Sequence, residues 1–123
     1  MMLPRSLRVI LVEDEALIAM IIEEMISDLG CTAIGPAATL DEALSLVAST
    51  TDADCALLDI NLRGASSWPI ADALRAKGVP FAFVSGYGPA GLEPKYKGET
   101  VLAKPIDTMQ LETWLTEVAS RGV

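Results

Sequence analysis

Short runs of consecutive apolar residues alternate along the chain with longer stretches in which apolar residues recur every three or four positions. The short runs predict buried strands at 9–12, 32–35, 55–58, 81–84 and 101–103. The amphipathic stretches predict helices at 15–29, 40–47, 69–77 and 108–118. Alternating strands and helices predict a parallel sheet with helices on both faces, a doubly wound (βα)5 fold of the α/β class.

Several residues mark the ends of these elements. Thr39 and Glu42 form the pattern of a capping box at the start of a helix, and Asp107 is placed to cap the last helix. Gly30 follows the first helix, where glycine commonly ends a helix. The segment 86–99 is rich in glycine and proline, so we predict that any helix there is short or irregular.

The composition narrows the class of protein. The 123 residues suit one domain, and we predict a single domain over residues 1–123, with a core at about 7–119 and short loose ends. The net charge of −8 argues against nucleic-acid binding, because phosphate backbones are bound by concentrated positive charge. The chain has no histidine, which excludes Ser-His-Asp and Cys-His catalysis and histidine-based zinc sites.

The sequence also gives no indication of secretion or of a membrane partner. No secretory signal is visible at its start, and its longest apolar run, 16–22, is far shorter than the roughly 20 residues of a membrane helix. Cys31 and Cys55 lie beside apolar runs and form no Cys-x-x-Cys pair, which is typical of buried free thiols. We therefore expect a cytoplasmic protein.

Polar residues follow four of the predicted strands. Glu13 and Asp14 follow the first strand, Asp59 the third, Ser85 the fourth and Lys104 the fifth. Because parallel strands end at one edge of the sheet, we expect these side chains to share one site. Three carboxylates with one lysine leave a deficit of positive charge, which Mg²⁺ or Mn²⁺ would fill through oxygen ligands. Such a site favours phosphoryl chemistry with Asp59 as the nucleophile.

Four short motifs carry these residues: ILVEDE at 10–15, ALLDINLRG at 56–64, FVSG at 83–86 and LAKP at 102–105. Together, and in this order, they resemble the receiver domain of bacterial two-component response regulators, over residues 9 to about 118. The segment PFAFVSGYG at 80–88 is similar to the receiver subclass known as FATGUY, with Val84 and Ser85 in place of its Ala and Thr.

The resemblance implies a single-domain response regulator with a flavodoxin-like sheet of strand order 2-1-3-4-5. It implies that Asp59 accepts a phosphoryl group from a sensor histidine kinase or a histidine phosphotransfer protein. It also implies that Mg²⁺ is held by Glu13, Asp14, Asp59 and the backbone carbonyl of Asn61. Such a protein catalyses only its own phosphorylation and dephosphorylation, and is not otherwise an enzyme.

Further roles follow from the same resemblance. Ser85 and Lys104 would respond to the phosphorylated state, and the bond from Lys104 to Pro105 is expected to be cis, which would aim the lysine at the site. The last helix ends near Val118, so we expect no output domain and a signal passed by contacts with a downstream protein. We expect a monomer or a weak homodimer.

The chain departs from the family pattern at one position that matters for signalling. Val101 stands where the family often has a tyrosine or phenylalanine that moves on activation. We therefore expect the response to pass through Ser85 and the segment Gly86–Gly98, as a shift between two packings. Tyr87 is expected to shield the phosphoryl group from water and so lengthen its lifetime.

Two alternatives stay open from the residues. A receiver-like protein that binds partners without phosphorylation is one, although it would usually lack at least one of the site residues. A small phosphatase of the haloacid-dehalogenase type is the other, because Asp59-Ile60-Asn61 is similar to its Asp-x-Asp motif, with Asn61 in place of the second acid. Taken singly, Asp14 would be an ordinary helix cap and Asp59 an ordinary turn residue.

Overall fold

Five parallel strands form one central sheet in the computed structural model, which describes residues 3–86 and 92–121. In order across the sheet, the strands are β2 (Thr32–Ala37), β1 (Arg8–Val12), β3 (Cys55–Asp59), β6 (Phe81–Ser85) and β7 (Thr100–Ala103). Each neighbouring pair is parallel. If the five strands of this sheet are numbered 1 to 5 along the sequence, their order across the sheet is 2-1-3-4-5. This order confirms the predicted flavodoxin-like α/β fold.

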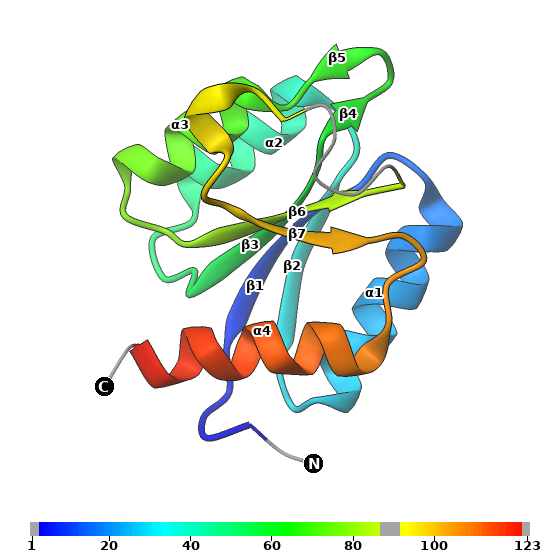
Figure 1. Cartoon of the computed structure of the whole chain (residues 1–123), viewed down its shortest axis with the longest axis vertical. Coiled ribbons are helices and arrows are strands. Elements are labelled where there is room, and N and C mark those ends of the chain that lie inside the picture. Colours follow the sequence, from blue (N-terminus) through cyan, green and yellow to red (C-terminus); the bar gives the residue numbers. More distant parts are fainter. Residues whose placement is uncertain (1–2, 87–91, 122–123) are drawn as a thin grey trace.

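Helices cover both faces of the sheet (Figure 1). One face carries α1 (Ala16–Asp28) and α4 (Thr108–Arg121), and the other carries α2 (Leu40–Ser49) and α3 (Trp68–Ala76). Side chains alternate along β1, so that Val9 and Leu11 pack toward α1 and α4 while Ile10 and Val12 pack toward α2 and α3. This burial on both sides explains why the strands are continuous apolar runs.

The sequence pattern does not predict a short antiparallel hairpin that follows β3. Its strands, β4 (Asn61–Leu62) and β5 (Ala65–Ser66), are joined by Arg63 and Gly64, whose φ angles are 49° and 85°. Positive φ at both loop residues suits the twist of a two-residue hairpin, and glycine adopts it without strain. The hairpin lies directly after Asp59, beside the carboxyl edge of the sheet (Figure 1).

The two predicted helix caps, Thr39 and Asp107, are both present at the starts of their helices. The Thr39 side chain accepts a hydrogen bond from the backbone N–H of Glu42 at 3.2 Å, and the Glu42 carboxylate accepts one from the N–H of Ala38 at 2.9 Å. The Asp107 carboxylate accepts one from the N–H of Met109 at 2.7 Å. Within the glycine-rich segment, the described residues form one short 3-10 helix, η1 (Pro94–Tyr96), as predicted.

The second strand extends further than its sequence suggests. It was predicted at 32–35 and continues through Pro36 to Ala37, which is possible because β2 is an edge strand. Gly35 has φ of 110°, and a Cβ there would lie 2.9 Å from the carbonyl oxygen of Leu11. Only glycine fits this close approach of two strands.

Residues near both ends of the described chain belong to regular structure or contact it. Arg5 forms an ion pair with Asp54 at 2.9 Å, and the Ser6 hydroxyl donates to the carbonyl of Gly30 at 2.7 Å. Helix α4 continues to Arg121, beyond the predicted end at 118. Among residues 3–86 and 92–121, the helices are all too short or too polar to cross a bilayer.

The two cysteines are buried and free, as predicted. Cys31 lies beside α1 and Cys55 begins β3, and both belong to the core cluster on the face covered by α1 and α4. Burial raises the pKa of both thiols, which disfavours the thiolate that would react with oxidants or bind metal. They therefore act as core packing residues.

Candidate functional site

The carboxyl edge of the sheet gathers three carboxylates and one ammonium group. Glu13 and Asp14 follow β1, Asp59 ends β3 and Lys104 follows β7. One carboxylate oxygen from each of the three acids lies within 4.8 Å of the other two. The Lys104 Nζ atom lies 2.8 Å from Asp59 Oδ1 and 3.2 Å from Glu13 Oε1. The predicted grouping of these four residues is therefore present in the structure.

Strand register brings these residues together from distant parts of the sequence. Val12 of β1 pairs with Leu58 of β3, which places the following residues of the two strands side by side. Ser85 ends β6 and is buried, and its carbonyl accepts a hydrogen bond from the N–H of Lys104 at 2.9 Å. The bond from Lys104 to Pro105 is cis, as the family resemblance implies.

Burial makes the electrostatics of this cluster unfavourable without a further cation. Glu13 and Asp59 expose only 2% and 4% of their surface. Burial, together with the neighbouring Glu13, raises the pKa of Asp59 to about 8, although Lys104 opposes the rise. Burial alone would lower the pKa of Lys104, but its hydrogen bond to Asp59 outweighs this and raises it. A bound divalent cation would relieve the repulsion that the single lysine leaves.

Asp14 has a different environment from Asp59. Partial burial would raise its pKa, but hydrogen bonds from the backbone N–H of Arg63 and with Glu13 outweigh burial and lower the pKa. The Arg63 N–H lies 3.0 Å from Asp14 Oδ2. The turn of the β4–β5 hairpin thus favours the ionised form of Asp14. Sequence reasoning missed this donor, and the signal that could have found it is Gly64 in a two-residue turn.

A hollow of about 430 Å³ opens over the cluster. Its lining includes Asp14, Asp59, Asn61, Ser85 and Lys104. Asn61 is the first residue of β4, two positions after Asp59, so it lies at the mouth of the same hollow. The donors of the acid cluster are oxygens only, a set that suits Mg²⁺ or Mn²⁺ and suits zinc poorly.

The segment that follows Ser85 is described only in part. Gly86 lines the hollow, and a Cβ on this residue would meet no atom within 4 Å, so space alone does not require a glycine there. Tyr87 lies outside the described residues, so its predicted role as a shield stays a prediction. Val101 is half-buried and packs on the side of the sheet covered by α2 and α3.

Comparison with known proteins identifies the family. Residues 9–116 match the family model of the response regulator receiver domain. This match covers most of the chain, and the chain therefore belongs to the receiver domain family of response regulators. The family assignment made from the four sequence motifs is confirmed.

The similar proteins include the regulator PhyR from two bacteria and the protein SdrG. The phyllosphere-induced regulator PhyR of Methylorubrum extorquens is 35% identical over 81 residues, which make up 64% of this chain and 30% of PhyR. SdrG from Sphingomonas melonis is 33% identical, with a TM-score of 0.79 and coverage of 92% of this chain and 96% of SdrG. The response regulator PhyR from Brucella abortus is 29% identical, with a TM-score of 0.82 and coverage of 96% of this chain and 49% of the PhyR chain. The chain thus spans about half or less of these PhyR proteins.

A more distant neighbour shares the fold. The receiver domain of the sensor histidine kinase PA1611 from Pseudomonas aeruginosa is 21% identical, with a TM-score of 0.77 and coverage of 94% of this chain and 99% of that domain. That domain was determined with a magnesium ion coordinated in its active-site cleft. Its likeness to this chain establishes the common architecture.

Proposed function

We propose that Asp59 accepts a phosphoryl group from a phosphohistidine of a sensor histidine kinase or of a histidine phosphotransfer protein, in a reaction that requires Mg²⁺ or Mn²⁺. The observation that carries this proposal is the meeting of three carboxylates and Lys104 at one edge of the sheet. Glu13, Asp14, Asp59 and the backbone carbonyl of Asn61 would hold the metal. Membership of the receiver family supports the same reading.

In the proposed transfer, a carboxylate oxygen of Asp59 attacks the phosphorus, the phosphorus–nitrogen bond breaks, and the released imidazole takes up a proton. Lys104 is already 2.8 Å from Asp59 Oδ1, so its ammonium group can follow an oxygen of the transferred group. Ser85 lines the same hollow and can donate its hydroxyl to another oxygen. A bound divalent cation supplies the remaining neutralisation of phosphoryl charge.

The surface beside the site supports docking of the partner that donates the phosphoryl group. Leu17, Met20 and Ile21 on α1 expose 71%, 63% and 47% of their surface, which is unusual for large apolar residues. An apolar hollow of about 90 Å³ lies between α1 and the residues that follow Lys104, including Pro105. Exposed apolar groups beside a reactive centre suit a helix from a partner protein.

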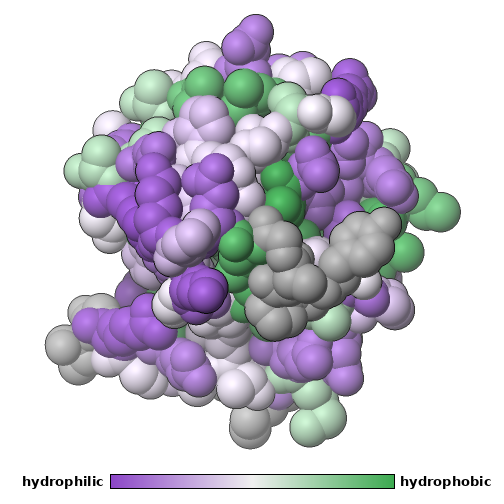
Figure 2. Space-filling view, turned by 45° about the horizontal axis from the view of Figure 1, so that its top comes forward, coloured by the Kyte–Doolittle hydropathy of each residue, from purple (hydrophilic) through white to green (hydrophobic). Residues whose placement is uncertain are grey.

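Other features support a regulator that works through protein contacts in the cytoplasm. The face seen in Figure 2 is mostly hydrophilic, with hydrophobic side chains in small separate groups. The net charge of −8 disfavours nucleic acid as a partner. We propose a single receiver domain over residues 1–123, monomeric or weakly dimeric, that changes its contacts with a downstream protein when phosphorylated and has no substrate other than its phosphodonor.

The proposal is tested by labelling with acetyl phosphate, followed by intact mass. Wild type should gain one phosphoryl group per chain with Mg²⁺ and none with EDTA, and Asp59→Asn should gain none in either buffer. Asp28→Asn, which removes an exposed acid at the end of α1, is the matched control and should label like wild type.

The two alternatives predict different results, one in this labelling experiment and one in a phosphatase assay. A receiver that acts without phosphorylation would gain no label with Mg²⁺, and this result would overturn the proposal. A phosphatase of the haloacid-dehalogenase type would hydrolyse many molecules of p-nitrophenyl phosphate per chain. Asn61 stands where that class needs its acid–base aspartate, so we expect no such turnover.

A further inference from the structure

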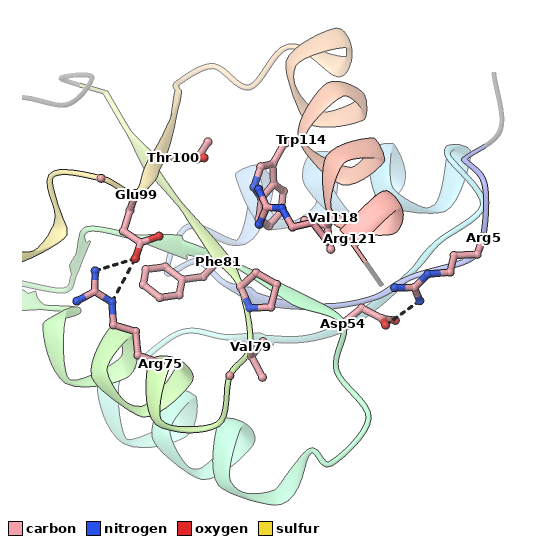
Figure 3. Close-up of a pocket in the computed structure, with 13 residues that line it drawn as sticks. Arg5, Asp54, Arg75, Val79, Phe81, Glu99, Thr100, Trp114, Val118 and Arg121 are labelled. Atoms are coloured by element: carbon pink, nitrogen blue, oxygen red, sulfur yellow. Dashed lines mark hydrogen bonds and ion pairs between the residues drawn. The ribbon is translucent and has the colours of Figure 1, made fainter. Parts of the chain in front are cut away.

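We propose that a hollow at the opposite end of the sheet from Asp59 is a second binding site, for a small organic anion that joins a carboxylate or phosphate group to an apolar group. The hollow has a volume of about 660 Å³, within the range of about 300–1,000 Å³ that ligand sites occupy. It lies where β6 and β7 begin, between the end of α3 and helix α4 (Figure 3).

The hollow concentrates positive charge on an acidic protein. Arg5, Arg75 and Arg121 line it, and they are three of the five arginines in the whole chain. Asp54 and Glu99 are the acids in its lining, so the hollow carries one net positive charge while the chain carries −8. The hollow is therefore less negative than the chain as a whole, which favours a small anion there over other parts of the surface.

Two of the arginines are held in place before any ligand arrives. Arg5 pairs with one oxygen of Asp54 at 2.9 Å, and the other oxygen of Asp54 accepts the backbone N–H of Arg8 at 2.8 Å. Arg75 donates to Glu99 at 2.7 and 3.2 Å, and its guanidinium lies 4.7 Å from the centre of the Tyr96 ring. Guanidinium groups that are already fixed lose little conformational entropy when they bind an anion. Each guanidinium has five N–H donors, so it can bind an anion while it keeps its carboxylate partner.

The third arginine and the floor complete the site. The Arg121 side chain is 59% exposed, and its ion pair with Glu117 is long, at 3.7 Å. Such an exposed pair is weak, so the Arg121 side chain can turn toward a ligand. The floor includes two aromatic residues, Trp114 and Phe81, which expose 3% and 4% of their surface. Figure 3 shows them between the Arg75–Glu99 pair on one side and the Arg5–Asp54 pair on the other. An anion with an apolar group matches this arrangement of charges around an aromatic floor.

The test is a titration of the full chain, labelled with ¹⁵N, with benzoate, phenylphosphonate and uncharged benzamide, followed by NMR. Saturable shifts at residues lining the hollow with benzoate or phenylphosphonate support the proposal, and the tighter of the two identifies the anion. Benzamide should bind at least about fivefold more weakly, because it lacks the charge. The proposal is overturned if neither anion gives saturable shifts there, or if benzamide binds as tightly.

Two variants locate the contacts. Arg121→Gln should weaken anion binding about fivefold. Arg8→Gln is the matched control, because Arg8 lies at the same end of the sheet but pairs with Asp52 and does not line the hollow. Equal weakening by both variants would mean general attraction of anions to this end of the protein and would overturn the site. Asp59→Asn should bind the anion as tightly as wild type, which separates this site from the phosphorylation site.

Discussion

Replacing Asp59 with asparagine is expected to stabilise the metal-free protein, and the gain should grow with pH. The pKa of Asp59 is about 8 in the folded protein, against an ordinary value of 3.8, because burial and Glu13 disfavour its charge. The folded protein therefore keeps a proton that the unfolded chain releases. The contribution of this proton to the free energy of unfolding is fully present below about pH 4, and it is lost as the pH rises through about 8.

The magnitude follows from proton linkage. One proton of difference between the folded and unfolded states changes the free energy of unfolding by at most about 1.4 kcal/mol per pH unit. From about pH 5 to about pH 8, wild type should therefore lose up to about 4 kcal/mol relative to Asp59→Asn. For a domain of this size, the gap in Tm at the upper pH is on the order of 10 °C.

The assay is urea unfolding in EDTA, followed by circular dichroism at several pH values across this range. Asp28→Asn is the control, because Asp28 is exposed and its loss should change stability by less than about 0.5 kcal/mol. Parallel pH profiles for wild type and Asp59→Asn would show that Asp59 titrates alike in the folded and unfolded states, which contradicts a raised pKa in the folded protein.

Four further predictions concern other parts of the chain. Tyr96→Phe removes a hydroxyl that donates to the Asp72 carboxylate, and urea unfolding should show a loss of about 1 kcal/mol; an unchanged midpoint would contradict a role for this bond. Thr39→Ala should cost about 1 kcal/mol in the same assay through loss of the helix cap, and Thr39→Ser should keep most of it. Tyr87→Ala should speed loss of the phosphoryl group after phosphodonor is removed, and an equal rate would end the shielding hypothesis. Beryllofluoride with Mg²⁺ should shift NMR signals across 86–98, whereas identical spectra would exclude a response through that segment.

The sheet and the site were predictable because each buried strand is a continuous apolar run that ends at a polar residue. Asp59, Ser85 and Lys104 each stand at such an end, and the topology of a parallel sheet then places them on one edge. The second strand was harder to delimit, because Gly35 and Pro36 interrupt its apolar pattern. Gly35 is explained by the close approach of Leu11, and Pro36 is tolerated because β2 is an edge strand.

Other features depend on contacts between distant parts of the sequence. The turn at Arg63 and Gly64 supplies a hydrogen bond to Asp14, which is 49 positions away from Arg63 in the sequence. The raised pKa of Asp59 depends on burial and on its distance to Glu13, and neither can be read from residue order. The arginines of the second hollow are scattered along the chain and meet only because strands and helices begin and end at the same edge.

In the proposed function, the carboxylate of Asp59 becomes phosphorylated at a magnesium-dependent site. The most direct measurement is to label the protein with acetyl phosphate and Mg²⁺, reduce it with borohydride, and sequence the resulting peptides by mass spectrometry. Borohydride converts an aspartyl phosphate into homoserine, so we expect homoserine at position 59 and none when EDTA replaces Mg²⁺. Homoserine at position 14, or at no position in the chain, would contradict the proposed function.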